Sequence, residues 1–217
     1  MLNPLYFDLL NGTIETLYMV FTAGIFAVLL GLPLGILLFI TQPKRLLPHA
    51  LLNKSLALLV DVTRSIPFII LMLTIIPLTR WLVGSSIGTT AAIVPLSLAA
   101  IPFIARLTET SLATITPGLI EAGQAMGASR LQIVFFILLP EARPALIDSF
   151  TTTLINLVGY SAMAGAIGGG GLGDLAIRYG YQRFNLTVLL TTLVILITLV
   201  QMIQCTGSCL AKRFTRQ

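Results

Sequence analysis

The sequence predicts an all-α integral membrane protein with a single transmembrane domain covering residues 1–217. Apolar residues make up 56% of the chain and charged residues only 10%, whereas soluble domains carry about 25% charged residues. The apolar residues gather in stretches of about 20 residues or more, the length that a bilayer requires of a helix. Lys and Arg produce a net charge of +5 and stand at the ends of these stretches. The positive charge therefore indicates orientation in a bilayer and not binding of nucleic acid.

Five apolar stretches are predicted to be transmembrane helices, at roughly residues 14–40, 56–78, 90–107, 144–166 and 186–210. We expect prolines inside them to be tolerated where neighbouring groups satisfy the freed carbonyls. Basic residues favour the cytoplasmic side, which predicts an N-terminus outside and a C-terminus inside. In that orientation three basic residues are outer and ten are inner; the outer ones are Arg80, Arg178 and Arg183, and the inner ones are Lys44, Arg45, Lys54, Arg64, Arg106, Arg130, Arg143, Lys212, Arg213 and Arg216.

Residues 116–140 interrupt the apolar pattern, and their local signals predict a short helix first. Thr116 can act as N-cap before Pro117, and Gly127 supplies the left-handed residue that ends the helix. Glu121 lies near the start, where a carboxylate complements the helix dipole. The small residues of this helix would let another surface approach closely. The residues alone leave two interpretations open, a protrusion that fits a partner and an amphipathic connector lying on the bilayer.

A second helix is predicted directly after the first. Ser129 and Gln132 have the spacing of a capping box. The apolar run that follows is expected to end at Pro140, because proline lacks the N–H that a helix interior needs.

The fourth predicted span carries a polar stripe on one helical face. Thr152, Asn156, Tyr160 and Met163 follow one another at spacings of four, four and three, with Ser161 nearby. Polar side chains in a membrane helix serve either helix packing or a conduit, and the residues alone leave both open.

A glycine-rich run, residues 165–173, follows this span, and three of its glycines match the spacing of a dinucleotide-binding loop. The run follows a membrane helix rather than a strand, so dinucleotide binding is rejected. Asp174, Arg178 and Arg183 then form a predicted outer surface that could dock a soluble partner.

The charged pair in the second predicted span and the two cysteines are expected to be structural. Asp61 and Arg64 are three residues apart and are expected to pair near the cytoplasmic boundary; a role in communication with a partner is the alternative. Cys205 and Cys209 have no further ligands nearby, so no metal site is predicted. The chain contains neither a phosphate-binding loop motif nor a catalytic constellation, which argues against an ATPase or an intramembrane enzyme.

The region at residues 116–140 resembles the EAA signature of the permease subunits of ABC importers. That signature reads Glu-Ala-Ala, three residues, Gly, nine residues, Ile, one residue, Leu-Pro, and six of its seven fixed positions match here. Gly123 replaces the second Ala. Residues 64–70, 159–163 and 179–181 also show a resemblance. They resemble the methionine-importer permeases, which belong to the type I class of importers.

The resemblance implies a cytoplasmic coupling helix that contacts an ATPase, with six residues carried over: Glu121, Ala122, Gly123, Ala125, Met126 and Gly127. It also implies a bacterial inner-membrane homodimer, an ATPase dimer that binds ATP and Mg²⁺, and an external substrate-binding lipoprotein. This chain itself would need no cofactor. Asn156, Tyr160, Ser161 and Met163 would then line the translocation path.

Three other functions are alternatives to methionine import. One is a structural or scaffold membrane protein, for which transport would be indifferent to residues 116–140. Related permeases for other amino acids or betaines share the coupling signature. A secondary transporter would need ion-coupling groups within the membrane, and none of the eight acidic residues stands clearly in mid-span.

Overall fold

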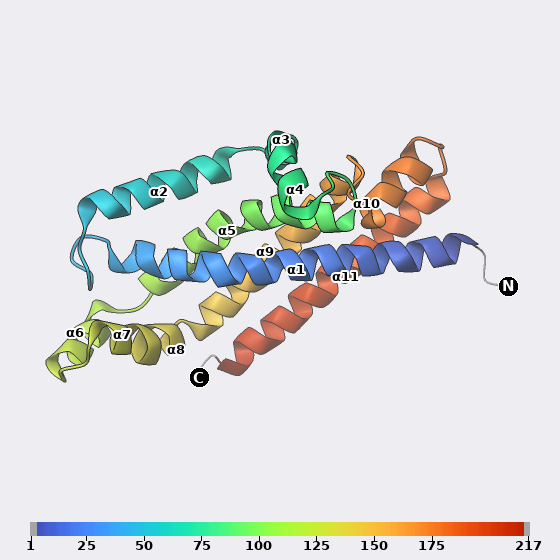
Figure 1. Ribbon diagram of the computed structural model, residues 1–217. Helices are drawn as coiled ribbons and strands as arrows, with labels where there is room; N and C mark the ends of the chain where they lie inside the picture. The colour runs from blue at the N-terminus through green and yellow to red at the C-terminus, as the bar shows by residue number, and fades with distance from the viewer. Residues whose placement is uncertain (1–3, 215–217) are drawn as a thin grey trace.

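The computed structural model describes residues 4–214, and every regular element within this range is a helix (Figure 1). The long helix α1 (Pro4–Ile40) extends through most of the molecule and packs along α5 (Thr89–Ala113). Helices α9 (Arg143–Gly165) and α11 (Leu186–Phe214) complete the bundle. Arg216, which entered the charge count, lies outside the described residues.

Three helices are long and apolar enough to cross a membrane, namely α1, α5 and α11. Helix α9 has 23 residues, enough to span about 30 Å of hydrocarbon, but hydroxyl, amide and carboxylate side chains make it less apolar. Its neighbours α1, α5 and α11 cover much of its surface. A helix that packs mainly against protein needs fewer apolar side chains than one that faces lipid.

The predicted second span, 56–78, is not one continuous helix. Helix α2 (Ala50–Ser65) ends before Pro67, and α3 (Phe68–Thr74) leaves at 99° to it. Ile66 is extended, with ψ of 122°, because a residue before proline is pushed out of the helical region. A third piece, α4 (Ile76–Val83), closes the segment at Gly84, whose φ is +79°.

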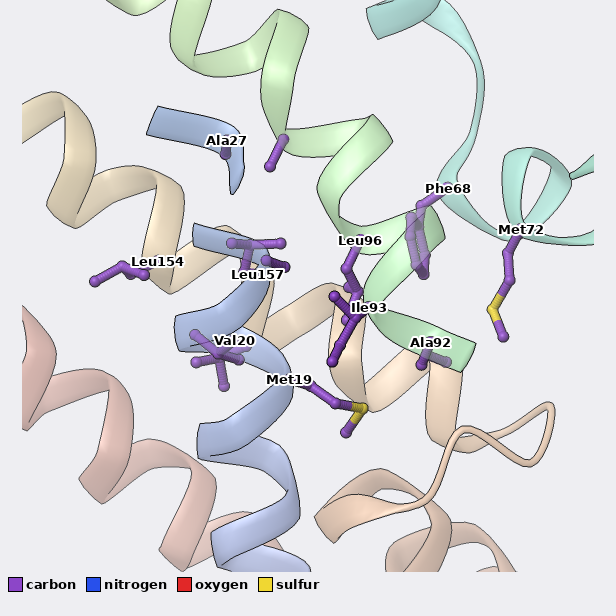
Figure 2. Close-up of a cluster of buried hydrophobic side chains, with 14 of the residues drawn as sticks. Met19, Val20, Ala27, Phe68, Met72, Ala92, Ile93, Leu96, Leu154 and Leu157 are labelled. Atoms are coloured by element: carbon purple, nitrogen blue, oxygen red, sulfur yellow. The ribbon is translucent and has the colours of Figure 1, made fainter. Parts of the chain in front are cut away.

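The main hydrophobic core joins five helices, α1, α3, α5, α9 and α11, and Figure 2 shows part of it. Met19 and Val20 of α1 are completely buried. They pack with Leu96 of α5 and Leu157 of α9, and Phe68 reaches the same cluster from α3. The broken segment is therefore anchored in the core although its helices are short.

Helices α1 and α5 approach so closely that only glycine fits at their contact. A Cβ at Gly31 would lie 2.7 Å from the carbonyl oxygen of Ile101, and one at Gly35 would strike the backbone of Ala105. This backbone contact cannot be relieved by moving a side chain. It fixes α5 against α1, and with it the segment that follows α5.

That segment contains α6 (Pro117–Ala125), α7 (Arg130–Gln132), η1 (Ile133–Leu138) and α8 (Leu139–Glu141). The prediction that Pro140 ends the second helix is wrong, since α8 continues through it and α9 begins at Arg143. The π-helix η1 precedes the proline, and the Leu139 N–H donates to the Val134 oxygen five residues back. This wider turn interrupts the ordinary series of hydrogen bonds to the residue four positions back. Pro140, which has no N–H to donate, therefore fits here without losing a bond.

The opposite end of the bundle is closed by α10 (Gly171–Leu175) and η2 (Ala176–Tyr181). Side chains of α1 cap α10: the Gly171 N–H donates to Glu15 Oε2 at 2.7 Å, and the Leu172 N–H donates to Thr16 Oγ1 at 2.9 Å. Gly171 has φ of +73°. The glycine run thus forms a tight backbone turn packed on α1.

Candidate functional site

Helix α6 projects from one end of the molecule (Figure 1), and its exposed surface carries small and apolar side chains. Thr116 precedes it in an extended conformation, and Gly127 after it has φ of +79°. Met126 is 88% exposed and Leu119 is 38% exposed. Glu121, Ala122 and Ala125 are also exposed. The helix therefore offers a shallow surface that another protein could approach closely.

Gly123 differs from the other five predicted contact residues, because the structure buries it on the inner face of α6. A Cβ there would lie 2.6 Å from Ile137 Cδ1. Gly123 and the neighbouring Ile120 hold α6 against η1. Only the tip of a flexible side chain opposes the added carbon. Alanine, which the EAA signature has at this position, would therefore fit after a small shift.

A separate hydrophobic cluster supports α6 from below. Its buried members come from α1, the loop after it, α5 and the α6–α9 segment: Phe39, Leu46, Leu112, Ile115, Ile120, Ile133, Val134, Leu138 and Ala142. The capping box after α6 is confirmed, with the Ser129 N–H donating to Gln132 Oε1 at 2.7 Å and the Gln132 N–H donating to Ser129 Oγ at 3.3 Å. Force on α6 therefore acts on a packed unit and not on a loose loop.

A charge network ties α2 and the loop after α1 to α5 at this same end. Arg106 donates to Glu109 Oε2 at 2.7 Å and also pairs with Asp61 of α2. Gln42 Nε2 donates to the other carboxylate oxygen of Glu109 at 2.7 Å. The expected Asp61–Arg64 pair is only a loose contact, at 4.0 Å, because Arg106 provides the nearer cation.

Helix α9 leaves a polar face uncovered by the rest of the chain. Thr152 and Met163 are exposed, and Asn156 and Tyr160 are partly exposed. Asp148, one turn before Thr152, is exposed on the same face and was missed in the sequence. Its spacing of four residues could have included it. A polar strip on a membrane helix without a partner in its own chain is suited to face a second subunit or an aqueous path.

Ser161 does not belong to this face. It is completely buried on the opposite side of α9, where its hydroxyl donates to the Val158 carbonyl at 2.8 Å. Five residues separate it from Asn156, which turns it about 140° around the helix. Tyr160 instead stacks on Phe68 of α3, with ring centroids 4.7 Å apart and planes 6° apart. Phe68 is a buried residue of α3, and its contact with Tyr160 is one that the sequence did not indicate.

The three residues of the predicted outer surface, Asp174, Arg178 and Arg183, lie close together around the ring of Tyr179. Arg178 pairs with Asp174 at 2.7 Å. The guanidinium groups of Arg178 and Arg183 lie 5.0 and 4.5 Å from the centre of the Tyr179 ring. Asp174 also lines a small polar pocket with Asp8 and Glu15 of α1. Both arginines are exposed and can still contact another molecule.

No group of three or more His, Cys, Asp or Glu side chains suited to hold a metal ion occurs within residues 4–214. Cys205 and Cys209 are exposed and unbonded to each other.

Comparisons with known proteins agree on one family. Residues 27–206 match the family model described as "Binding-protein-dependent transport system inner membrane component". The "Probable D-methionine transport system permease protein MetI" of Vibrio cholerae is 53% identical over 205 residues, which cover 94% of this chain and 91% of the relative. The "D-methionine transport system permease protein MetI" of Escherichia coli K12 is 52% identical over 165 residues, 76% of each chain.

Solved structures show the same relationship. A chain from "Inward facing conformations of the MetNI methionine ABC transporter" superposes with a TM-score of 0.97 at 50% identity over 100% of both chains. A chain of "an amino acid ABC transporter with histidines" shares the fold, with a TM-score of 0.71 at 20% identity over 97% of this chain and 92% of that one. The chain therefore belongs to the family of binding-protein-dependent transport system inner membrane components and is a multi-pass inner-membrane protein.

Proposed function

We propose that this chain is the permease subunit of an ATP-driven ABC importer for methionine, both D and L forms and their derivatives. The single observation that carries the proposal is the exposed surface of small residues on α6. Helix α6 packs on a buried hydrophobic cluster, and the chain belongs to a family of transport components. Relatives about half identical in sequence are named D-methionine permeases. The chain itself is non-catalytic, and a partner ATPase binds ATP and Mg²⁺ and hydrolyses the ATP.

In the proposed topology the chain crosses the membrane five times, with the N-terminus outside and the C-terminus inside. The spans are α1, the bent α2–α3 segment, α5, α9 and α11. This arrangement puts α6 in the cytoplasm, where an ATPase can reach it, and α10 with η2 outside. Asp174, Arg178 and Arg183 would then meet the substrate-binding lipoprotein.

A second copy of the chain would pair with this one through the uncovered face of α9. Asn156, Tyr160 and Met163 would then line a path between the two copies. ATP binding closes the ATPase dimer and draws the two α6 helices together. Because α6 packs with α1, α5 and η1, its movement turns the bundle and opens the path outward; hydrolysis returns it to face inward.

The coupling role is tested by co-purification of the ATPase with the Glu121→Lys variant. The expected result is loss of the ATPase from a chain that still inserts in the membrane. Glu141→Lys is the matched control, because Glu141 is also an exposed carboxylate near this end but lies outside α6. Gly127→Val should act like Glu121→Lys, since valine resists a φ of +79°. Normal ATPase recovery with both α6 variants would overturn the assignment.

Substrate and energy source are tested in liposomes that hold the assembled transporter. Methionine with the binding lipoprotein should stimulate ATP hydrolysis and uptake, and uptake should persist after ion gradients are collapsed. Stimulation by another amino acid or a betaine alone would reassign the substrate. Uptake that follows an ion gradient without ATP would favour a secondary transporter.

A further inference from the structure

A groove of about 620 Å³ lies between four helices of the bundle, and the proposed transport function does not use it. Its walls come from α1, α5, α9 and α11, including Ile25, Leu29, Phe150, Leu154 and Ile203. Its size is in the range of small-molecule sites, about 300–1,000 Å³. It opens between helices of a membrane protein, so lipid is the molecule that reaches it at highest concentration.

The walls of the groove are mostly apolar and favour a hydrocarbon chain. The Thr151 hydroxyl donates to the Ile147 carbonyl at 2.8 Å, and the Thr206 hydroxyl donates to the Met202 carbonyl at 2.8 Å. Thr108 is the third hydroxyl of the lining, and it is completely buried. Along these walls a polar ligand would find few hydrogen-bonding partners apart from Arg143 at one end, whereas a hydrocarbon chain would lose nothing there.

The groove has charge at one end only. Arg143, at the start of α9, is the single charged residue of the lining. On α11 the groove-facing residues are Ile203, Thr206, Gly207 and Leu210, and Arg213 continues their face three residues beyond Leu210. Both arginines are exposed, and neither forms an ion pair with any residue in the range 4–214.

The groove also faces away from the side where a second copy would pack. Its α9 residues, such as Phe150 and Leu154, are two positions from Thr152 and so point about 200° around the helix from the uncovered polar face. A homodimer formed through that polar face leaves the groove open to the bilayer.

We propose that this groove is a binding site for an anionic phospholipid. An acyl chain lies along the apolar walls, and the headgroup phosphate pairs with Arg143 and Arg213. Basic residues at the headgroup end of a crevice between transmembrane helices are the arrangement that selects anionic lipids. The groove lies where α1 meets α9 and α11. Helix α1 packs less tightly there than it does against α5.

Native mass spectrometry of the full chain, purified in detergent, delipidated and titrated with dioleoyl phosphatidylglycerol or dioleoyl phosphatidylcholine, tests the proposal. The wild type should bind the anionic lipid more tightly. Arg143→Gln with Arg213→Gln should remove that preference, at about fivefold in affinity per arginine. Lys54→Gln with Arg130→Gln, which removes two cations away from the groove, should keep it.

Filling the groove gives a second, independent readout. Leu29→Trp should lower the binding of both lipids, because the ring would occupy the space of the acyl chain, whereas Leu30→Trp should not, since Leu30 is exposed but does not line the groove. Equal binding of the two lipids by the wild type, or no effect of Leu29→Trp, would overturn the proposal. The proposal would also be overturned if Leu29→Trp removed the dimer peak from the spectra and left lipid binding unchanged. That result would identify a second copy of the chain as the occupant of the groove.

Discussion

At the scale of single residues, most of the buried hydroxyl groups in this bundle are paired with a carbonyl of their own helix. Thr192, for example, donates to Val188 at 3.0 Å and to Leu189 at 2.9 Å. Thr108 is the exception among the described residues, because its buried Oγ1 has no partner. An unpaired buried hydroxyl costs about 1–3 kcal/mol, so this position is a local weakness.

Replacing Thr108 by Val should therefore raise stability by about 1 kcal/mol, since the shape is kept and the unpaired oxygen is removed. Thermal unfolding of the detergent-solubilised chain measures the effect. Ser111→Ala is the comparison, because Ser111 Oγ meets Ser149 Oγ of α9 at 3.0 Å and its loss should lower stability. A fall in the unfolding temperature for Thr108→Val would show that the oxygen has a role in the membrane.

Arg106 is the residue on which the charge network depends. Glu109 is 7% exposed, and removal of Arg106 would leave this carboxylate with only the Gln42 amide. Breaking a buried pair in this way costs about 3–5 kcal/mol. Asp61 is half exposed, so removing its charge should cost much less, about 1 kcal/mol or below.

The prediction is that Arg106→Met destabilises the chain far more than Asp61→Asn. Adding Glu109→Gln to Arg106→Met should recover part of the loss, because the uncompensated buried charge is then gone. Unfolding midpoints of the four proteins decide the matter. Equal effects of the two single variants would mean that the Arg106–Glu109 pair contributes no more to stability than the exposed Asp61 contact.

At the scale of elements, the broken second span is held by contacts that local sequence signals do not contain. Pro95 and Pro102 lie inside α5 without ending it, and both are buried, whereas Pro67 separates two helices by a sharp turn. The difference follows from what lies after the proline. Phe68 turns into the core and stacks on Tyr160, a contact between residues far apart in sequence.

A double-mutant cycle measures this contact. Phe68→Leu and Tyr160→Leu should show a coupling energy of about 0.5–1.5 kcal/mol in stability, the usual range for paired aromatic rings. Strictly additive effects would mean that the rings are not stacked in the bilayer and that α3 is held by other contacts.

The distinction between contacts of residues close in sequence and contacts of residues far apart explains how much of the structure could be predicted. Gly127 after α6 and the capping box at Ser129 follow from residues a few positions apart, and these predictions agree with the structure. Thr116 stands at the N-cap position of α6 as predicted, but its side chain makes no capping hydrogen bond. The Gln42–Glu109 bond joins residues 67 apart, and no pattern in one sequence indicates it. Pro140 misled the prediction because a π-helix, which has no local sequence signal, accommodates it.

Among the candidate site residues, periodicity correctly grouped Thr152, Asn156, Tyr160 and Met163 on one face of α9. It failed for Ser161, which was included for its closeness in sequence and not for its helical angle. Gly123 was assigned with its neighbours on α6 because helical position alone does not reveal which face packs on η1.

At the scale of the whole molecule, a chain that exposes a polar strip within the bilayer is incomplete by itself. The account predicts that two copies meet along this strip. In a Cys205→Ser, Cys209→Ser background, Thr152→Cys should form a disulfide-linked dimer in oxidised membranes. Val194→Cys, which is 61% exposed on α11, should stay monomeric. A dimer from Val194→Cys alone would place the interface on α11.

The most direct measurement is cross-linking from the end of α6, the proposed coupling helix, in the same cysteine-free background. Met126→Cys in inverted inner-membrane vesicles, treated with a short bifunctional reagent, should yield an adduct with an ABC ATPase. The same cysteine should be unreactive to an impermeant maleimide in intact cells. Labelling of Met126→Cys from outside the cell, or no ATPase adduct from a fully reactive cysteine, would contradict the account.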